Sequence, residues 1–89
     1  MPGSCDIIIP AHNSASVLPL TLKALYRQQV PPLWSPRLIL CDDGSTDETA
    51  PLARTIKAPP NWRPSLIISI SHQGAAAARN TGIKAARGK

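Results

Sequence analysis

Two adjacent carboxylates, Asp42 and Asp43, are the residues of this sequence best placed to do chemistry, because they directly follow the apolar run 38–41. Consecutive strand residues point to opposite faces, so the two carboxylates cannot act as a face-to-face acid/base pair. One can reach into a crevice above the sheet while the other holds the loop, and Gly44 lets the backbone turn sharply beside them. A carboxylate in that crevice only accepts hydrogen bonds, which suits a ring N–H such as that of uracil or thymine. On these residues alone, a turn that caps the next helix explains the pattern equally well.

A second polar run, Pro10-Ala11-His12, ends the aliphatic residues 7–9 in the same way. The flat imidazole of His12 could stack on a base while exposed backbone groups meet the carbonyl groups of that base. Taken by itself, His12 is more simply interpreted as a partly buried surface histidine. The case for a ligand site therefore depends on both polar runs lying together.

A third run, residues 74–82, is rich in small residues that permit close helix packing. Arg79 lies about one and a half turns into the expected helix, where it could pair with the carboxylates of the neighbouring strand end or with phosphate. The alternative is a plain packing helix on which Arg79 is solvated.

Alternating strands and helices must position these three runs. We expect strands at residues 6–10, 37–41 and 65–71, and helices from a cap among 13–16 to about Gln29, from a cap at Thr46 or Asp47 to about 57, and from Ala75 to Arg87. Such alternation predicts an α/β fold with right-handed crossovers onto a parallel sheet. The carboxyl ends of parallel strands meet at one edge of the sheet, which is where ligands of open α/β sheets bind.

The two longer helices differ in their expected packing. Leu18, Leu22 and Leu25 recur at helical spacing and form one apolar stripe on the first helix. In the last helix Gly82 is expected to be a local weakness, because glycine has a low helix propensity.

The charge of the chain is unevenly distributed. Net charge is +5, and every acidic residue lies at or before Glu48. A solvated surface balanced by another segment, an anionic diphosphate and a membrane surface each remain open as explanations. We expect no nucleic-acid partner, because the three aromatic residues, Tyr26, Trp34 and Trp62, are not interleaved with a basic cluster.

The cysteines and the amino terminus indicate a cytoplasmic protein. Cys5 and Cys41 fall at opposite ends of neighbouring strands, too far apart for a disulfide. The first residues have no basic segment followed by an apolar one, so no signal peptide is expected, and no apolar run is long enough to span a bilayer.

Together the runs IIIPAHN, ILCDDGSTD and GAAAARNTG resemble the family 2 glycosyltransferases of the GT-A fold, in the same order and at similar spacing. The resemblance implies that residues 1–89 are the incomplete, amino-terminal nucleotide-sugar-binding part of a glycosyltransferase domain. It implies a Rossmann-like β-α-β-α-β-α half of that fold, with a mainly parallel three-stranded sheet. The parent enzyme would transfer a sugar from a nucleotide-sugar donor, in our interpretation a UDP-sugar, to an acceptor hydroxyl with inversion.

The same likeness assigns residues to the site. Five would bind the nucleotide: Pro10, Ala11, His12, Asp43 (as acceptor of the ring N–H) and Arg79. Three would shape the site: Asp42, Gly44 and Gly74.

The acidic groups that the family uses later in its sequence are not in this segment. The resemblance implies a divalent ion, Mg²⁺ or Mn²⁺, in the full-length enzyme, but neither its carboxylate ligands nor the catalytic base can lie beyond Glu48 here. We therefore expect no metal ligand and no catalytic residue in this chain. The implied partners are the donor, an acceptor that the segment does not specify, and a membrane surface near the parent enzyme. The alternative function is a non-catalytic nucleotide-binding module or docking fragment; a dinucleotide-binding Rossmann protein is disfavoured because Gly-x-Gly-x-x-Gly is absent.

Overall fold

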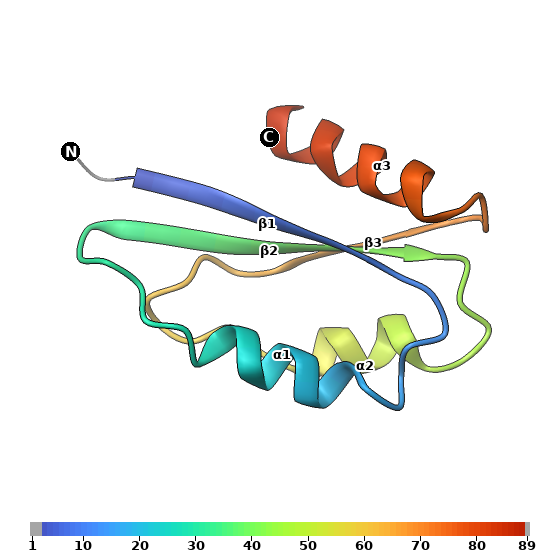
Figure 1. Cartoon of the computed structure of the whole chain (residues 1–89), viewed down its shortest axis with the longest axis horizontal. Coiled ribbons are helices and arrows are strands. Elements are labelled where there is room, and N and C mark those ends of the chain that lie inside the picture. Colours follow the sequence, from blue (N-terminus) through green and yellow to red (C-terminus); the bar gives the residue numbers. More distant parts are fainter. Residues whose placement is uncertain (1–2, 89) are drawn as a thin grey trace.

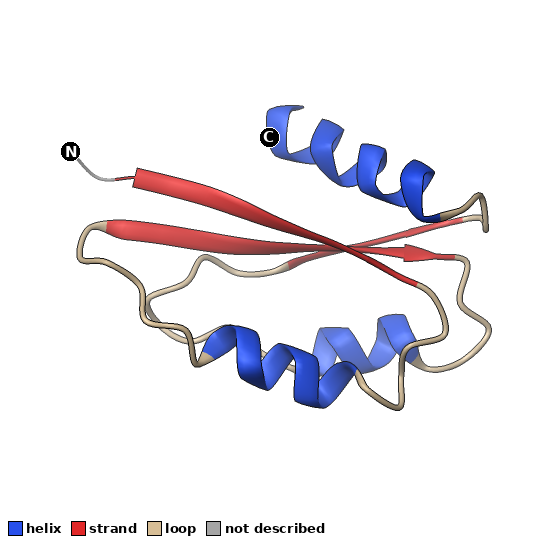
Figure 2. Cartoon of the chain, viewed as in Figure 1, coloured by secondary structure: helices blue, strands red, loops and turns tan. Residues whose placement is uncertain are grey.

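The computed structural model describes residues 3–88 and contains three strands and three helices in strict alternation. In chain order the elements are β1 (Gly3–Ala11), α1 (Leu18–Tyr26), β2 (Trp34–Asp43), α2 (Thr49–Thr55), β3 (Leu66–Ile70) and α3 (Ala75–Gly88). Figure 1 shows that α1 and α2 lie on one side of the sheet and α3 on the other, and Figure 2 shows the resulting layers of helix, strand and helix. The predicted α/β class is confirmed.

The sheet is parallel throughout, with β2 between β1 and β3. The register pairs Ala11 with Asp42, and Asp43 with Ile70. The three strands therefore end at the same edge of the sheet. The loops after β1, β2 and β3 start side by side, as ligand binding at this edge requires.

The face of the sheet that packs on α1 and α2 forms the larger core. Leu18 and Leu22 of α1 are buried against Leu38 and Leu40 of β2, and the partly buried Leu25 packs on the same cluster. The predicted apolar stripe on α1 is thus confirmed. Burying side chains of this size stabilises the fold by about 1.5–3 kcal/mol each.

The opposite face packs on α3 through small residues, and Gly82 lies in this contact. A Cβ at Gly82 would lie 2.5 Å from Cγ2 of Ile8 and 3.0 Å from Sγ of Cys41. Ala78, one turn earlier on the same face, is fully buried. The helix backbone therefore approaches the sheet closely at Gly82, and the low helix propensity expected to weaken the helix there is the cost of that approach.

Both long strands extend beyond their expected bounds through a proline. β1 continues through Pro10 because it is an edge strand, where the missing N–H faces no partner strand. β2 begins at Trp34 and includes Pro36, whose carbonyl accepts a hydrogen bond from the backbone N–H of Arg63 at 2.8 Å. β3 pairs with β2 only from Ile39 onward, so Pro36 also has a free side.

The expected helix caps were wrong at both of the first two helices. α1 begins after Val17, which makes no side-chain cap, and it ends at Tyr26, three residues before the expected Gln29. α2 begins after Glu48, not Thr46 or Asp47, although Asp47 still accepts a hydrogen bond from the backbone N–H of Thr49 at 3.0 Å. Asn13, one of the residues expected to cap α1, instead binds the loop that follows β2 through its side chain.

Cys5 is exposed, Cys41 is buried, and both are free, as their strand positions predict. Within residues 3–88, no helix combines the length and the apolar character needed to cross a bilayer.

Candidate functional site

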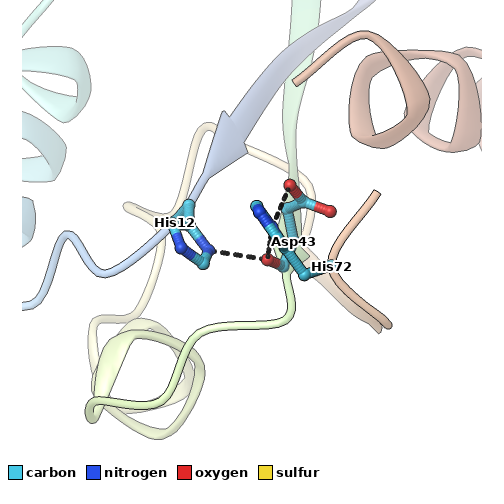
Figure 3. A group of neighbouring side chains, drawn as sticks. All are labelled: His12, Asp43 and His72. Carbon is cyan, nitrogen blue, oxygen red and sulfur yellow. Dashed lines mark hydrogen bonds and ion pairs between the residues drawn. The ribbon is translucent and has the colours of Figure 1, made fainter. Parts of the chain in front are cut away.

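Three side chains from three separate loops meet at the carboxyl edge of the sheet. His12 directly follows β1, Asp43 is the last residue of β2, and His72 lies two residues after β3. Figure 3 shows the two imidazoles next to each other, with Asp43 beside them. This convergence follows from the parallel sheet, because each strand delivers its first loop residues to the same edge.

Asp43 is buried, with an exposed fraction of 2%, and its carboxylate has several donors. The backbone N–H groups of Gln73 and Gly74 donate to Oδ1 and Oδ2 at 2.8 and 2.9 Å, and Nδ1 of His72 lies 2.9 Å from Oδ2. The Gln73 N–H lowers the pKa of Asp43 most, burial opposes it, and Gly74 and His72 lower it further. Asp43 is therefore an anion at neutral pH, and it also fixes the turn that begins α3.

His12 and His72 stack on each other, with ring centroids 4.3 Å apart and planes inclined by 23°. Nδ1 of His12 is 2.7 Å from the main-chain oxygen of Asp43, and Nδ1 of His72 is 3.1 Å from the same oxygen. A carbonyl oxygen only accepts, so each of these nitrogens donates. One face of His12 is thus covered by His72, and a base can stack on His12 only from its other face or after the pair separates.

Asp42 points to the other face of the sheet, as the strand alternation requires. It is 5% exposed, and its Oδ1 accepts from the backbone N–H of Ser45 at 3.3 Å and from the Ser45 hydroxyl. Gly44, between them, has φ of +64°, and a Cβ there would lie 2.5 Å from the backbone nitrogen of His72. Only glycine therefore lets the β2 and β3 loops lie this close.

Asn13 fastens the loop after β1 to the loop after β2. Its Oδ1 accepts from the backbone N–H groups of Thr46 and Asp47 at 2.8 and 3.3 Å, and its own N–H donates to Ser45 Oγ at 2.8 Å. Asn13 adopts a left-handed conformation, with φ of 48°, which asparagine tolerates better than most residues. This clamp explains why Asn13 caps no helix.

Asp47 adds a second tie between the same loops. It accepts from the Thr49 hydroxyl, and its Oδ2 accepts from the backbone N–H of Ala15 at 3.1 Å. The Thr49 hydroxyl lowers the pKa of Asp47 most, burial opposes it, and the Ala15 N–H adds to the lowering. The loop framework of the site is therefore set by side chain to backbone hydrogen bonds.

A cavity of about 160 Å³ opens at this edge of the sheet. Its lining residues are Pro10, Ala11, His12, Asp43, His72, Gly74 and Ala75. The structure thus brings together four of the five residues expected to bind the nucleotide. His72 was missed, although it follows a strand end just as His12 does, which is the signal that could have found it.

Arg79 is the predicted residue that the structure does not bring to the cavity. It is exposed, and among residues 3–88 it forms no ion pair with either carboxylate of the acidic turn. The preceding residue, Ala78, is fully buried against the sheet. Adjacent helix residues are separated by about 100°, so a buried Ala78 directs Arg79 away from the strand ends.

The Mg²⁺ or Mn²⁺ expected for the full-length enzyme does not fit the ligand groups of this segment. Within the described chain, the one group of three candidate ligands is His12, Asp43 and His72. Two of its three donors are imidazole nitrogens, whereas Mg²⁺ and Mn²⁺ prefer oxygen ligands. The carboxylates of Asp42 and Asp47 already accept hydrogen bonds from the backbone N–H groups of loop residues.

Comparison with known proteins places this geometry in context. The protein-family model described as glycosyl transferase family 2 matches residues 6–89 of this chain. A PGL/p-HBAD biosynthesis glycosyltransferase of Mycobacterium tuberculosis is 41% identical over 84 residues, which are 93% of this chain and 31% of that protein. An O-antigen chain rhamnosyltransferase of Salmonella typhimurium is 43% identical over 51 residues, which are 57% of this chain and 15% of that protein. A minor teichoic acid biosynthesis protein of Bacillus subtilis is 34% identical over 80 residues, which are 88% of this chain and 17% of that protein. The chain thus spans less than a third of the length of these relatives.

Proposed function

This chain belongs to glycosyl transferase family 2, and we propose that it forms the nucleotide-binding part of an inverting enzyme that transfers a sugar from a nucleotide-sugar donor to an acceptor hydroxyl. The observation that carries the proposal is the cavity at the carboxyl edge of the sheet. Pro10, Ala11, His12 and Asp43 line it together.

The size of the cavity supports a base as its occupant. At about 160 Å³ it is smaller than the roughly 300–1,000 Å³ of most sites for whole ligands. It suits a single heterocycle, so the ribose, diphosphate and sugar of the donor would extend beyond it. The residues of this chain would bind and orient the base, and the groups that activate the acceptor would come from another part of the protein.

The state of Asp43 supports uracil over adenine. Of its two carboxylate oxygens, Oδ1 accepts one backbone N–H within the described chain, from Gln73, and an ionised carboxylate oxygen can accept two. The second lone pair of Oδ1 suits the ring N–H of uracil, and adenine has no such group. The N–H of Gln73, with Gly74 and His72 beside it, holds the pKa of Asp43 below its usual range, so the acceptor keeps its charge at neutral pH.

Calorimetry on the full-length protein tests this proposal. We expect uridine diphosphate to bind at least tenfold more tightly than adenosine diphosphate, a difference of about 1.4 kcal/mol. Equal affinity for the two nucleotides would contradict the assignment of Asp43 to uracil. Tight uridine diphosphate binding without any sugar transfer would instead favour the non-catalytic binding module.

A further inference from the structure

The only two histidines of this chain, His12 and His72, both face the same aspartate. One ring nitrogen from each histidine and one carboxylate oxygen of Asp43 lie within 4.8 Å of one another. The three residues lie at the ends of three different strands, so no single turn accounts for the grouping. In the proposed binding of a base, His12 and Asp43 contact the ligand, and no contact with the base is assigned to His72.

One distance within this group already matches the spacing of ligands at a metal site. Bonds of about 2.0–2.1 Å in tetrahedral geometry place zinc ligands roughly 3.3 Å apart. Nδ1 of His72 is already 2.9 Å from Oδ2 of Asp43. Nδ1 of His12 and Nδ1 of His72 lie 2.7 and 3.1 Å from the main-chain oxygen of the same residue. To ligate an ion through Nδ1, each neutral imidazole would carry its proton on Nε2 instead, which leaves the Nδ1 lone pair free for the ion.

The exposure of His72 and the hydrogen bonds that hold Asp43 also fit a metal site. The side chain of His72 is 62% exposed, so its ring can rotate towards the ring nitrogen of His12 without moving the backbone. Asp43, in contrast, is held by the N–H groups of Gln73 and Gly74. Outer hydrogen bonds of this kind orient the carboxylate ligands of metal sites.

From this geometry we propose that His12, Asp43 and His72 bind a divalent transition-metal ion of the zinc class. Two imidazoles and one carboxylate are a donor set that zinc uses, with a fourth position left to water or another ligand. The same set discriminates against Mg²⁺, Ca²⁺ and Mn²⁺, which favour oxygen ligands. The site is therefore distinct from the oxygen-rich metal site that the family resemblance implies elsewhere in the enzyme.

One consequence rests on the function proposed above. His12 and Asp43 would contact both the ion and the base, so the bound ion should compete with the nucleotide. Zinc would then weaken uridine diphosphate binding to the native protein, and substitution of His72 should remove this effect.

The proposal can be tested with Co²⁺, whose visible absorption reports tetrahedral ligation by imidazole. The titration uses the full-length protein in excess Mg²⁺, which fills oxygen-only sites. We expect Zn²⁺ to displace the Co²⁺, and His72→Asn and His12→Asn to raise the Kd for Co²⁺ by at least 10- to 100-fold, the scale of losses at metal sites. Cys5→Ser is the matched control, because the exposed Cys5 thiol is another soft donor outside the group, and it should leave the titration unchanged.

A second measurement needs no substitution in the site. In protein labelled with ¹⁵N-histidine, Zn²⁺ should shift the ring-nitrogen resonances of His12 and His72 together. Co²⁺ titrations that are the same for native protein and His72→Asn, or zinc titrations that leave these resonances in place, would overturn the proposal. Neither outcome depends on nucleotide binding, so failure here leaves the proposed function standing, and failure of nucleotide binding leaves the metal site standing.

Discussion

The two halves of the sheet each carry a cluster centred on an aspartate, and the two clusters differ in the groups that bind this aspartate. Toward the amino ends of the strands, Asp6 is bound by two arginines, Arg37 at 3.0 Å and Arg63 at 2.8 Å. At the carboxyl edge, Asp43 is bound by backbone N–H groups and faces two imidazoles. Asp6 and His12 are separated along the chain by roughly 20 Å of extended strand, so the two clusters can be altered independently.

In the amino-end cluster, the charged side chains bind one another. Arg37 donates to both oxygens of Asp6, and Arg63 also donates from Nε to the main-chain oxygen of Ser35 at 3.0 Å. Burial alone would raise the pKa of Asp6, but the hydrogen bond and charge of Arg37, with Arg63, lower it overall. This cluster ties the loop before β3 to β1 and β2, and none of its members lines the cavity at the carboxyl edge.

The carboxyl-edge cluster differs because its outer members are exposed. The side chain of His72 is 62% exposed, whereas those of Arg37 and Arg63 are 18% and 32% exposed. An anion with exposed, rotatable partners can exchange them for a ligand, whereas an anion held by two arginines would lose strong charge-assisted hydrogen bonds in such an exchange. The comparison therefore indicates a stabilising role for the Asp6 cluster and supports the binding role that we propose for the Asp43 cluster.

The largest expected effect tests whether the binding cluster depends on the close approach of its loops. Gly44→Ala places a Cβ 2.5 Å from the backbone nitrogen of His72 at a residue with φ of +64°. We expect the free energy of unfolding to fall by about 2–4 kcal/mol, measured by denaturant titration of the full-length protein. Gly74→Ala is the control, because its φ is +103° but a Cβ there meets nothing within 4 Å; it should cost less. Equal costs would mean that backbone strain alone, not the approach to His72, fixes Gly44.

The next effect tests whether the Asp6 cluster serves stability alone. Asp6→Asn removes the charge that Arg37 and Arg63 share, and hydrogen bonds to charged groups contribute about 1.5–3 kcal/mol. We expect unfolding to be easier by about that amount while uridine diphosphate affinity stays unchanged. Glu48→Gln, which neutralises an exposed carboxylate, should change stability by no more than about 0.5 kcal/mol. A loss of nucleotide affinity in Asp6→Asn would break the division between the two clusters.

The reverse experiment uses Asp43→Asn. The amide is a weaker acceptor than the carboxylate, so we expect uridine diphosphate affinity to fall by about tenfold. Because Asp43 also holds Gln73 and Gly74, the melting temperature should fall as well. Asp42→Asn is the matched neighbour: its side chain holds Ser45 on the other face, so it should lower the melting temperature with less effect on affinity. If both variants lost affinity equally, the acidic turn would act only as a scaffold.

These clusters also show how far the sequence can predict this protein. The three strands and their common edge followed from aliphatic runs that end in polar residues, and Pro10, Ala11, His12 and Asp43 were placed correctly at the cavity because parallel strands deliver their first loop residues together. Applied to the third strand, the same argument would have added His72.

Other features could not be read from the sequence because they depend on how the elements pack. The direction of Arg79 is set by the rotation of α3, which is fixed by the contacts of Ala78 and Gly82 with the sheet. Asn13 was assigned to a cap from local propensity, but the tertiary contact with Thr46 and Asp47 satisfies its side chain instead. In both cases a contact between distant segments, or between helix and sheet, overrides a local rule.

The smallest and most selective effect comes from acid. The pKa of Asp6 is lowered from its ordinary value of 3.8 by Arg37 and Arg63 against the opposing effect of burial. A lowered pKa in the folded state means that the ion pairs contribute their full stability above the unfolded value, and that this contribution is lost as the pH falls through the folded pKa. The side-chain amide of the Asp6→Asn variant does not titrate, and the lowered pKa values of Asp43 and Asp47 are common to both proteins. We therefore expect the stability gap between native protein and Asp6→Asn to be constant above about pH 5 and to close progressively below pH 3.8. If the stability gap did not narrow at all down to about pH 2, Asp6 would act through packing and not through its charge. The ion pairs with the two arginines would then no longer distinguish the amino-end cluster from the cluster at the carboxyl edge.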